Sequence, residues 1–222
     1  MVPPQNDHCD VEMQIWNSDG SPAEMCGNGA RCIAVWMQRE GRIKDTCRIG
    51  IGGRVVTAKS IRHEKTFGFA TVETGTPLLL TPVDGQAVTL DDSEFILHRV
   101  QIGNPHAVLF VESLSDTLVH DIGRHIEHHS DSPQRTNVEF AVEGEANEIH
   151  VRVWERGSGE TRACGSGACA VVAAGVHTGR LQKDEPYDIV LPGGTLQVQW
   201  RHNEVMLLAG PVEIVCTGSV VE

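Results

Sequence analysis

A short pattern occurs twice in this chain, and it constrains the fold more than any other feature. Residues 24–37 read EMCGNGARCIAVWM and residues 162–175 read RACGSGACAVVAAG, so both contain Cys-Gly-x-Gly-Ala. Counted from Cys26 or Cys164, small or apolar residues recur at offsets of four, seven, eight and eleven, which gives a helix one buried face. Gly41 and Gly179 follow where a glycine commonly ends a helix. Each copy therefore predicts a Cys-Gly-x-Gly turn followed by a short, buried helix.

The rest of the chain predicts mainly β-structure. Segments rich in β-branched and apolar residues are separated by Gly, Pro and Asn; they are 54–60, 66–73, 99–111, 148–154, 188–190, 195–200 and 204–209. One further helix is expected at 117–129. Two helices related by a repeat and surrounded by strands imply two similar halves with a cleft between them. The predicted fold is α+β, with two pseudo-symmetric halves that each wrap a mixed β-sheet or barrel around a central helix. Residues 1–76, completed by 212–222, would form the first half, and residues 77–211 the second.

Charge and cysteine content narrow the class of protein. The formal net charge of −12 argues against a nucleic-acid or anionic-membrane partner, because both attract basic surfaces. No run of about eighteen or more apolar residues predicts a membrane span, and the first residues lack the pattern of a secretory signal. We therefore expect a cytoplasmic protein. Its seven cysteines are expected to be free thiols rather than a disulfide framework.

Two groups of residues raise the question of a metal, and both have a simpler interpretation. The pairs Cys26/Cys32 and Cys164/Cys169 are not followed by a His at zinc-finger spacing. The histidines of the 117–129 segment fit the solvated polar face of a helix; they are His120, His125, His128 and His129. The sequence therefore predicts no metal site.

A cysteine at the start of a helix is suited to proton transfer. The unpaired N–H groups and the helix dipole favour negative charge there and so lower the pKa of a thiol. Glycines after the cysteine let a ligand approach these N–H groups, and a carboxylate would bind between two such helix ends. With Cys26 and Cys164 on opposite sides of the α-carbon of a bound amino acid, one thiolate would remove the α-proton and the other thiol would protonate the opposite face. This inversion needs no cofactor.

Several blocks of the sequence together resemble the diaminopimelate epimerase family of cofactor-independent, two-cysteine epimerases. The blocks keep the family's order and cover most of the chain. They are NSDGS at 17–21, MCGNGARC at 25–32, GNPH at 103–106, RTNV at 135–138, WERGSGET at 154–161 and ACGSGACA at 163–170. Taken alone, NSDGS would be only a turn and GNP only a break between strands. Because both occur together with the other blocks, each is interpreted as part of a site.

The resemblance implies interconversion of LL- and meso-2,6-diaminopimelate, in lysine and cell-wall precursor synthesis, by a homodimer of this fold. Cys26 and Cys164 would be the paired acid and base. His106 and Glu155 would set thiol protonation and steer the proton. The substrate groups would be bound by Asn17, Gly27, Asn28, Asn104, Asn137, Glu155, Arg156, Gly165 and Ser166. Of these, Arg156 suits a distal carboxylate, because its guanidinium is a planar fork of donors, whereas Asn28, Gly165 and Ser166 would face the reacting α-carboxylate. The two cysteines are locally alike, so the sequence does not assign the base for each isomer.

One family block has no counterpart here. Family members begin with a segment that contains Gly-Asn-Asp-Phe, whose Asn contacts substrate, and this tetrapeptide is absent. The resemblance therefore predicts a truncated first half. Three alternatives stay open: a proline or hydroxyproline racemase of the same fold, a non-catalytic truncated homologue, and a thiol redox protein. Asn28 argues against the first, since those racemases usually have His there, and the absence of C-x-x-C argues against the last.

Overall fold

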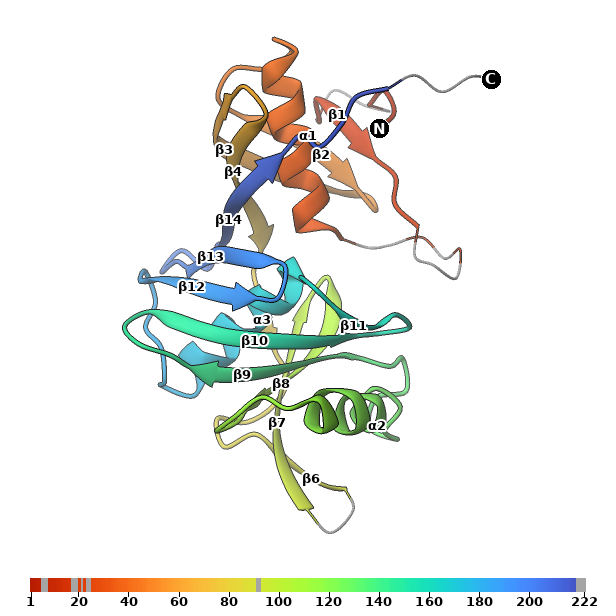
Figure 1. Ribbon diagram of the computed structural model, residues 1–222, viewed down its shortest axis with the longest axis vertical. Coiled ribbons are helices and arrows are strands. Elements are labelled where there is room, and N and C mark those ends of the chain that lie inside the picture. Colours follow the sequence, from red (N-terminus) through yellow and green to blue (C-terminus); the bar gives the residue numbers. More distant parts are fainter. Residues whose placement is uncertain (5–7, 17–19, 21, 23–24, 91–92, 219–222) are drawn as a thin grey trace.

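The computed structural model describes all residues from 1 to 222 except 5–7, 17–19, 21, 23–24, 91–92 and 219–222. It has the predicted α+β fold, in which two helices backed by strands lie one above the other (Figure 1). The upper half contains α1 (Gly27–Arg39), β1 (Val11–Met13), β2 (Cys47–Ile51), β3 (Arg54–Glu64) and β4 (Phe67–Gly75).

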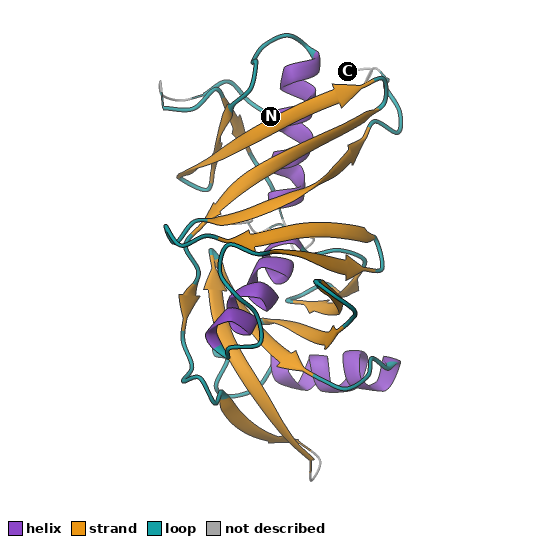
Figure 2. Ribbon diagram, turned by 90° about the vertical axis from the view of Figure 1, so that its left-hand side faces the viewer, coloured by secondary structure: helices purple, strands orange, loops and turns teal. Residues whose placement is uncertain are grey.

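The lower half is larger. Its helices are α3 (Gly165–His177) and a segment made of η1 (Leu118–Ile122) and α2 (Gly123–Glu127). Its strands are β5 (Leu78–Leu79), β6 (Gln86–Leu90), β7 (Ser93–Ile102), β8 (Asn104–Phe110), β9 (Asn137–Glu143), β10 (Glu148–Glu155), β11 (Gly159–Thr161), β12 (Pro186–Leu191) and β13 (Gly194–Trp200). Figure 2 shows strands around both long helices.

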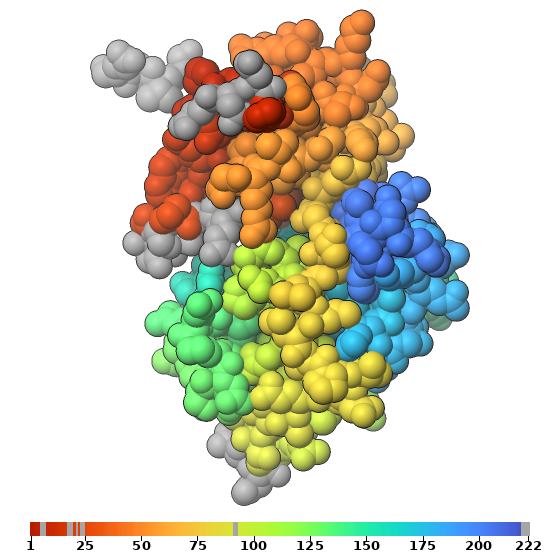
Figure 3. Space-filling model, turned by 180° about the vertical axis from the view of Figure 1, so that it is seen from behind, coloured from red at the N-terminus to blue at the C-terminus, as the bar shows by residue number. Residues whose placement is uncertain are grey.

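The last strand, β14 (Met206–Glu213), joins the halves. It pairs antiparallel with β13 below and with β4 above, so the strand order β1-β2-β3-β4-β14-β13-β12-β10-β9-β8-β7-β5 is continuous. Met206 and Leu208 pack in the lower core, whereas Val212 packs in the upper one. In the space-filling view, the red and orange upper surface meets the yellow, green and blue lower surface across one seam (Figure 3). The division at residue 76, with 212–222 returning to the first half, stays a prediction.

The two repeated helices are confirmed, with the predicted buried faces. Their inward residues are Ala30, Ile33, Ala34 and Met37 in α1, and Ala168, Val171, Val172 and Gly175 in α3. Gly41 (φ +68°) and Gly179 (φ +78°) follow the two helices. Their N–H groups donate to Gln38 and Val176 carbonyls, which caps carbonyls that the helix end leaves unpaired. None of the described helices is long and apolar enough to cross a membrane.

Some elements differ from the predictions. The 99–111 segment is not one strand, because Gly103 (φ +79°) turns the chain between β7 and β8. The 117–129 helix begins with a wider turn at 118–122. Its histidines have local partners: His125 and His128 each bond a backbone carbonyl four residues earlier, and His120 pairs with Glu160. The strands that were not predicted are β1, β2, β5, β6, β9 and β11.

Candidate active site

The two helix starts of the repeat face one shared region at the junction of the halves. Cys26 is the N-cap residue of α1, and its Sγ accepts from the Gly29 N–H at 3.3 Å. Cys164 occupies the same position on α3, and its Sγ accepts from the Gly167 N–H at 3.4 Å. Each thiol therefore satisfies one of the free N–H groups of its helix, as Ser or Asp does at an ordinary cap.

A leucine from the joining strand lies between the helix starts. A Cβ at Gly27 would lie 2.6 Å from Leu208 Cδ2, and one at Gly165 would lie 2.9 Å from the same atom. The Gly165 Cβ would also be 3.1 Å from Asn28 Oδ1. The glycine after each cysteine therefore allows close packing of the two helix starts against β14 and against each other.

A cavity of about 220 Å³ opens at this junction. It is lined by Met25, Cys26, Gly27, Asn28, Asn104, Asn137, Glu155, Arg156, Ser158, Ala163, Cys164, Gly165 and Ser166. The structure thus brings together residues from both repeats, from the β7–β8 turn, and from β9 and β10. Asn17 lies outside the described residues.

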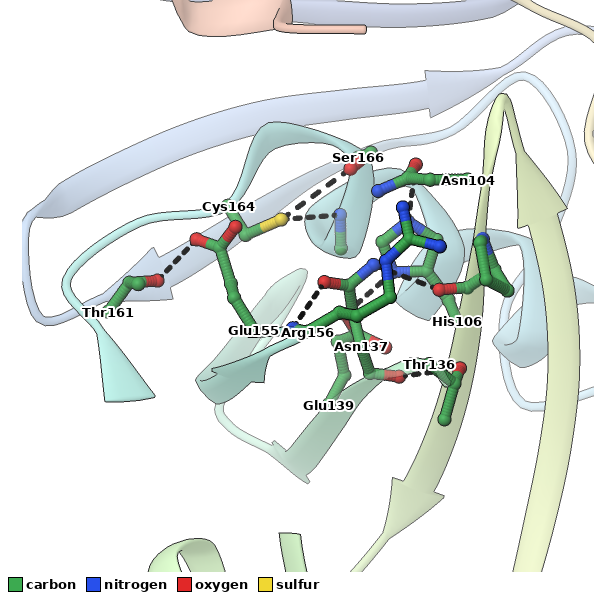
Figure 4. A network of polar contacts seen from close by, with 12 residues as sticks. Asn104, His106, Thr136, Asn137, Glu139, Glu155, Arg156, Thr161, Cys164 and Ser166 are labelled. Atoms are coloured by element: carbon green, nitrogen blue, oxygen red, sulfur yellow. Dashed lines mark hydrogen bonds and ion pairs between the residues drawn. The ribbon is translucent and has the colours of Figure 1, made fainter. Parts of the chain in front are cut away.

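Of the predicted residues that the structure describes, His106 does not line this cavity. It lies behind Asn104, with Nε2 3.0 Å from Asn104 Oδ1 and Nδ1 2.7 Å from Glu139 Oε1 (Figure 4). The His106 and Glu139 side chains are both 0% exposed. His106 can therefore reach the cavity only through Asn104 in this conformation.

Asn137 ties three segments of the wall together. Its Nδ2 donates to the Pro105 carbonyl at 2.9 Å, and its Oδ1 accepts from the Arg156 N–H at 3.0 Å. The Arg156 guanidinium reaches the Gln134 carbonyl. Glu155 accepts from the Thr161 hydroxyl, which leaves its second oxygen near Cys164 (Figure 4). One N–H of the Asn137 amide remains for a ligand.

The two cysteines differ in their surroundings. Cys164 is 6% exposed, whereas Cys26 is partly exposed. Burial raises the pKa of the Cys164 thiol, and the negative charges of Glu155 and Glu139 raise it further. Hydrogen bonds from Ser166 and the Gly167 N–H act in the opposite direction but are weaker. The expectation that a helix start lowers the thiol pKa is therefore wrong for Cys164, because desolvation outweighs the helix.

Sequence reasoning missed two buried charged residues beside the cavity. Glu139 lies two positions after Asn137 on β9 and hence on the same side of that strand. Arg31 is 5% exposed, and its Nη1 donates to Asn28 Oδ1 at 2.9 Å. The signal for both was a charged residue inside an otherwise apolar, buried element.

Comparisons with known proteins agree with this arrangement. The family model described as diaminopimelate epimerase matches residues 1–80 and 99–215. Among relatives, the diaminopimelate epimerase of Halothermothrix orenii is 37% identical over 100% of this chain and 81% of its own length. That of Synechococcus elongatus is 38% identical over 98% and 80%, and that of Bacillus cereus 34% over 96% and 78%.

Solved structures show the same fold at low identity. A probable proline racemase from Agrobacterium radiobacter, with bound carbonate, superposes with a TM-score of 0.76 at 11% identity and covers 100% of this chain and 75% of its own. A hydroxyproline epimerase from Agrobacterium vitis, with bound trans-4-hydroxy-L-proline, gives 0.75 at 14% identity, over 96% and 71%. The fold is therefore shared with a probable proline racemase and a hydroxyproline epimerase.

Proposed function

This chain belongs to the diaminopimelate epimerase family, and from that premise we propose that it interconverts LL- and meso-2,6-diaminopimelate by proton transfer between Cys26 and Cys164. It is an isomerase of the epimerase class. The reaction uses two protein thiols and needs no cofactor, because protein hydrogen-bond donors bind the substrate carboxylate and the two sulfurs transfer the α-proton.

The observation that carries this proposal is the pair of N-cap cysteines on one cavity. Each sulfur lies at the positive end of a helix, and each helix comes from a different half. The α-carboxylate would sit against the free N–H groups of both helix starts, with Asn28, Gly165 and Ser166 as donors. The α-carbon would then lie between the sulfurs, so that a proton leaves one face and arrives at the other.

The remaining polar wall suits the second amino-acid end of the substrate. Arg156 supplies a carboxylate partner, Glu155 an ammonium partner, and Asn104 and Asn137 supply amide groups. Glu155, which is also near Cys164, would steer the proton. A proline-type substrate has no second end to fill this part of the cavity, which favours diaminopimelate.

We propose that the enzyme works in the cytoplasm as a homodimer, without a nucleic-acid or membrane partner. Every one of its seven cysteines is free, and a reducing compartment such as the cytoplasm keeps thiols in this state. The net charge of −12 disfavours polyanionic partners. Size-exclusion chromatography with light scattering tests the dimer, and a mass of one 24.1 kDa chain would exclude it.

Proton NMR of diaminopimelate in D2O tests the reaction. We expect the α-hydrogen signal to disappear with the wild-type protein and to persist with Cys26→Ala or Cys164→Ala. The matched controls are Cys32→Ala and Cys169→Ala, which remove the second cysteine of each repeat and should retain exchange. If only proline or hydroxyproline loses its α-hydrogen, the substrate assignment is wrong; if no substrate exchanges, the chain is not an active epimerase.

A further inference from the structure

A buried carboxylate–imidazole pair lies directly behind the cavity wall. The His106 and Glu139 side chains are both 0% exposed, and Nδ1 lies 2.7 Å from Oε1. The other carboxylate oxygen, Glu139 Oε2, has no hydrogen-bond partner among the described residues. The charged or titratable groups that face this carboxyl group are His106 on β8, Glu155 on β10 and Cys164 at the start of α3. Of these three neighbours, only His106 can carry a positive charge.

Full burial determines how many protons the pair holds. A buried net negative charge without a compensating group is costly, and burial accordingly raises the pKa of Glu139, against the opposing effect of His106. A neutral pair contains one proton between Nδ1 and Oε1 and a second on Nε2. This count is the same for an imidazolium with a carboxylate and for an imidazole with a carboxylic acid whose proton lies on Oε1; a carboxyl proton on Oε2 would have no acceptor among the described residues. In both descriptions His106 Nε2 is a donor.

The donor state of Nε2 fixes the neighbouring amide. Nε2 lies 3.0 Å from the Asn104 side chain, and an N–H at this position requires that Asn104 turns its oxygen toward His106. The NH2 end of Asn104 is then the end available to the cavity, which Asn104 lines. A deprotonated Nε2 would demand the reverse orientation and would present the amide oxygen to the ligand.

From this arrangement we propose that Glu139 is a positioning residue: it keeps His106 Nε2 protonated, so that Asn104 presents its NH2 group to a carboxylate oxygen of the substrate. The step to the substrate rests on the proposed function. Glu139 is held in place by the first turn of α3, since a Cβ at Gly167 would lie 2.7 Å from Glu139 Oε1. The Gly167 N–H of the same turn also donates to Cys164 Sγ, so one turn of α3 contacts both Glu139 and the sulfur of Cys164.

The proton count can be read without substrate. In protein labelled with 15N-histidine, His106 is assigned from the signals that disappear in His106→Gln. At pH 7 we expect Nε2 to have the chemical shift of a protonated nitrogen, and this Nε2 signal to move toward the unprotonated shift in Glu139→Gln. An unprotonated Nε2 in the wild-type protein overturns the proposal, even if the variant does not fold. An unchanged His106 spectrum in Glu139→Gln overturns it too.

Kinetics test the link to Asn104. In Glu139→Gln the neutral imidazole holds a single proton, which can lie on Nδ1 and donate to the new amide oxygen, so Nε2 no longer donates to Asn104 in every molecule. At pH 7.5 we expect KM about tenfold above wild type with kcat changed by less than about threefold, the effect of one hydrogen bond to a charged group. In an Asn104→Ala background the added effect of Glu139→Gln should vanish.

The matched control is Glu143→Gln, at the exposed end of the same strand, where Glu143 pairs with Arg180; its KM and pH profile should equal those of wild type. An equal Glu139→Gln effect with and without the Asn104 side chain overturns the proposal. If wild-type protein shows no epimerase activity but the NMR result is as expected, the proposed function fails while the role of Glu139 in setting the proton count stands.

Discussion

At the residue scale, Arg31 determines which end of the Asn28 amide group faces the cavity. A guanidinium has only donors, so the Asn28 oxygen must face Arg31 Nη1, 2.9 Å away. The Asn28 NH2 group is then left for the cavity. Gly210 on β14 makes room for the guanidinium, because a Cβ there would lie 3.3 Å from Arg31 Cζ. Arg31 thus orients a donor although it does not line the cavity.

We expect Arg31→Met to raise KM for diaminopimelate about tenfold, since the loss of a hydrogen bond to a charged group costs about 1.5 kcal/mol. Arg31→Lys should recover part of this loss, because an ammonium group also donates. Steady-state kinetics provide the measurement, and Arg39→Met, on the exposed end of α1, is the control. An unchanged KM in Arg31→Met would show that Asn28 needs no such anchor.

The pH dependence of Cys164 belongs to the same scale. Burial, followed by Glu155 and Glu139, raises its thiol pKa, so at neutral pH Cys164 carries its proton in the ligand-free protein. Glu155→Gln removes one nearby negative charge and should lower this pKa. Because the thiolate is the reactive form, alkylation of Cys164 by iodoacetamide at pH 8.5 should be faster in Glu155→Gln, as measured by mass spectrometry of its peptide. A slower or equal rate contradicts this reasoning.

At the element scale, the starts of α1 and α3 are packed around a single leucine. An alanine normally favours a helix over glycine by about 1 kcal/mol. At Gly165, however, the new methyl group would lie 2.9 Å from Cδ2 of Leu208, which is 0% exposed and cannot swing into solvent. The steric overlap with Leu208 should outweigh the helix propensity of alanine, and we expect Gly165→Ala to lose about 1–3 kcal/mol of unfolding free energy.

Urea unfolding of Gly165→Ala measures this loss. In a Leu208→Ala background the penalty of the same substitution should shrink or reverse, because the cavity left by Leu208 receives the methyl group. Equal penalties in both backgrounds would mean that the overlap does not determine the stability of this junction.

The elements also show how far sequence reasoning extends. Both repeated helices were predictable, because the offsets from Cys26 and Cys164 alone give the buried face. Strand β9 was not, since Asn137 and Glu139 point inward at positions where an apolar residue would mark a strand. His106 was predicted to set thiol protonation, which stays a prediction, and sequence reasoning gave no sign that its Nε2 would face Asn104. Site residues interrupt the pattern from which strands are predicted, and their partners come from strands distant in sequence.

At the scale of the whole molecule, each half has a buried thiol in its core. Cys47 lies in the upper core and Cys169 in the lower one, both 0% exposed. Burial raises the pKa of each thiol to about 12, whereas an unfolded cysteine titrates at about 8.5. The folded state therefore keeps the protons of these two thiols, like that of Cys164, at pH values where the unfolded state releases them. Their stabilisation is complete below about pH 8.5 and is lost as pH rises toward 12.

The unfolding free energy should accordingly fall between pH 8.5 and 10.5, with each buried thiol contributing about 1.4 kcal/mol per pH unit. Urea unfolding at a series of pH values measures the slope. Cys47→Ala and Cys169→Ala should each reduce this slope by the contribution of one thiol. The double variant should reduce it by both contributions, because the two sites lie in separate cores and are expected to act independently. Cys216→Ala, which removes an exposed thiol, should leave the slope unchanged. A wild-type slope in the double variant would mean that other groups govern alkaline unfolding and that the two cores do not lose stability through their cysteines.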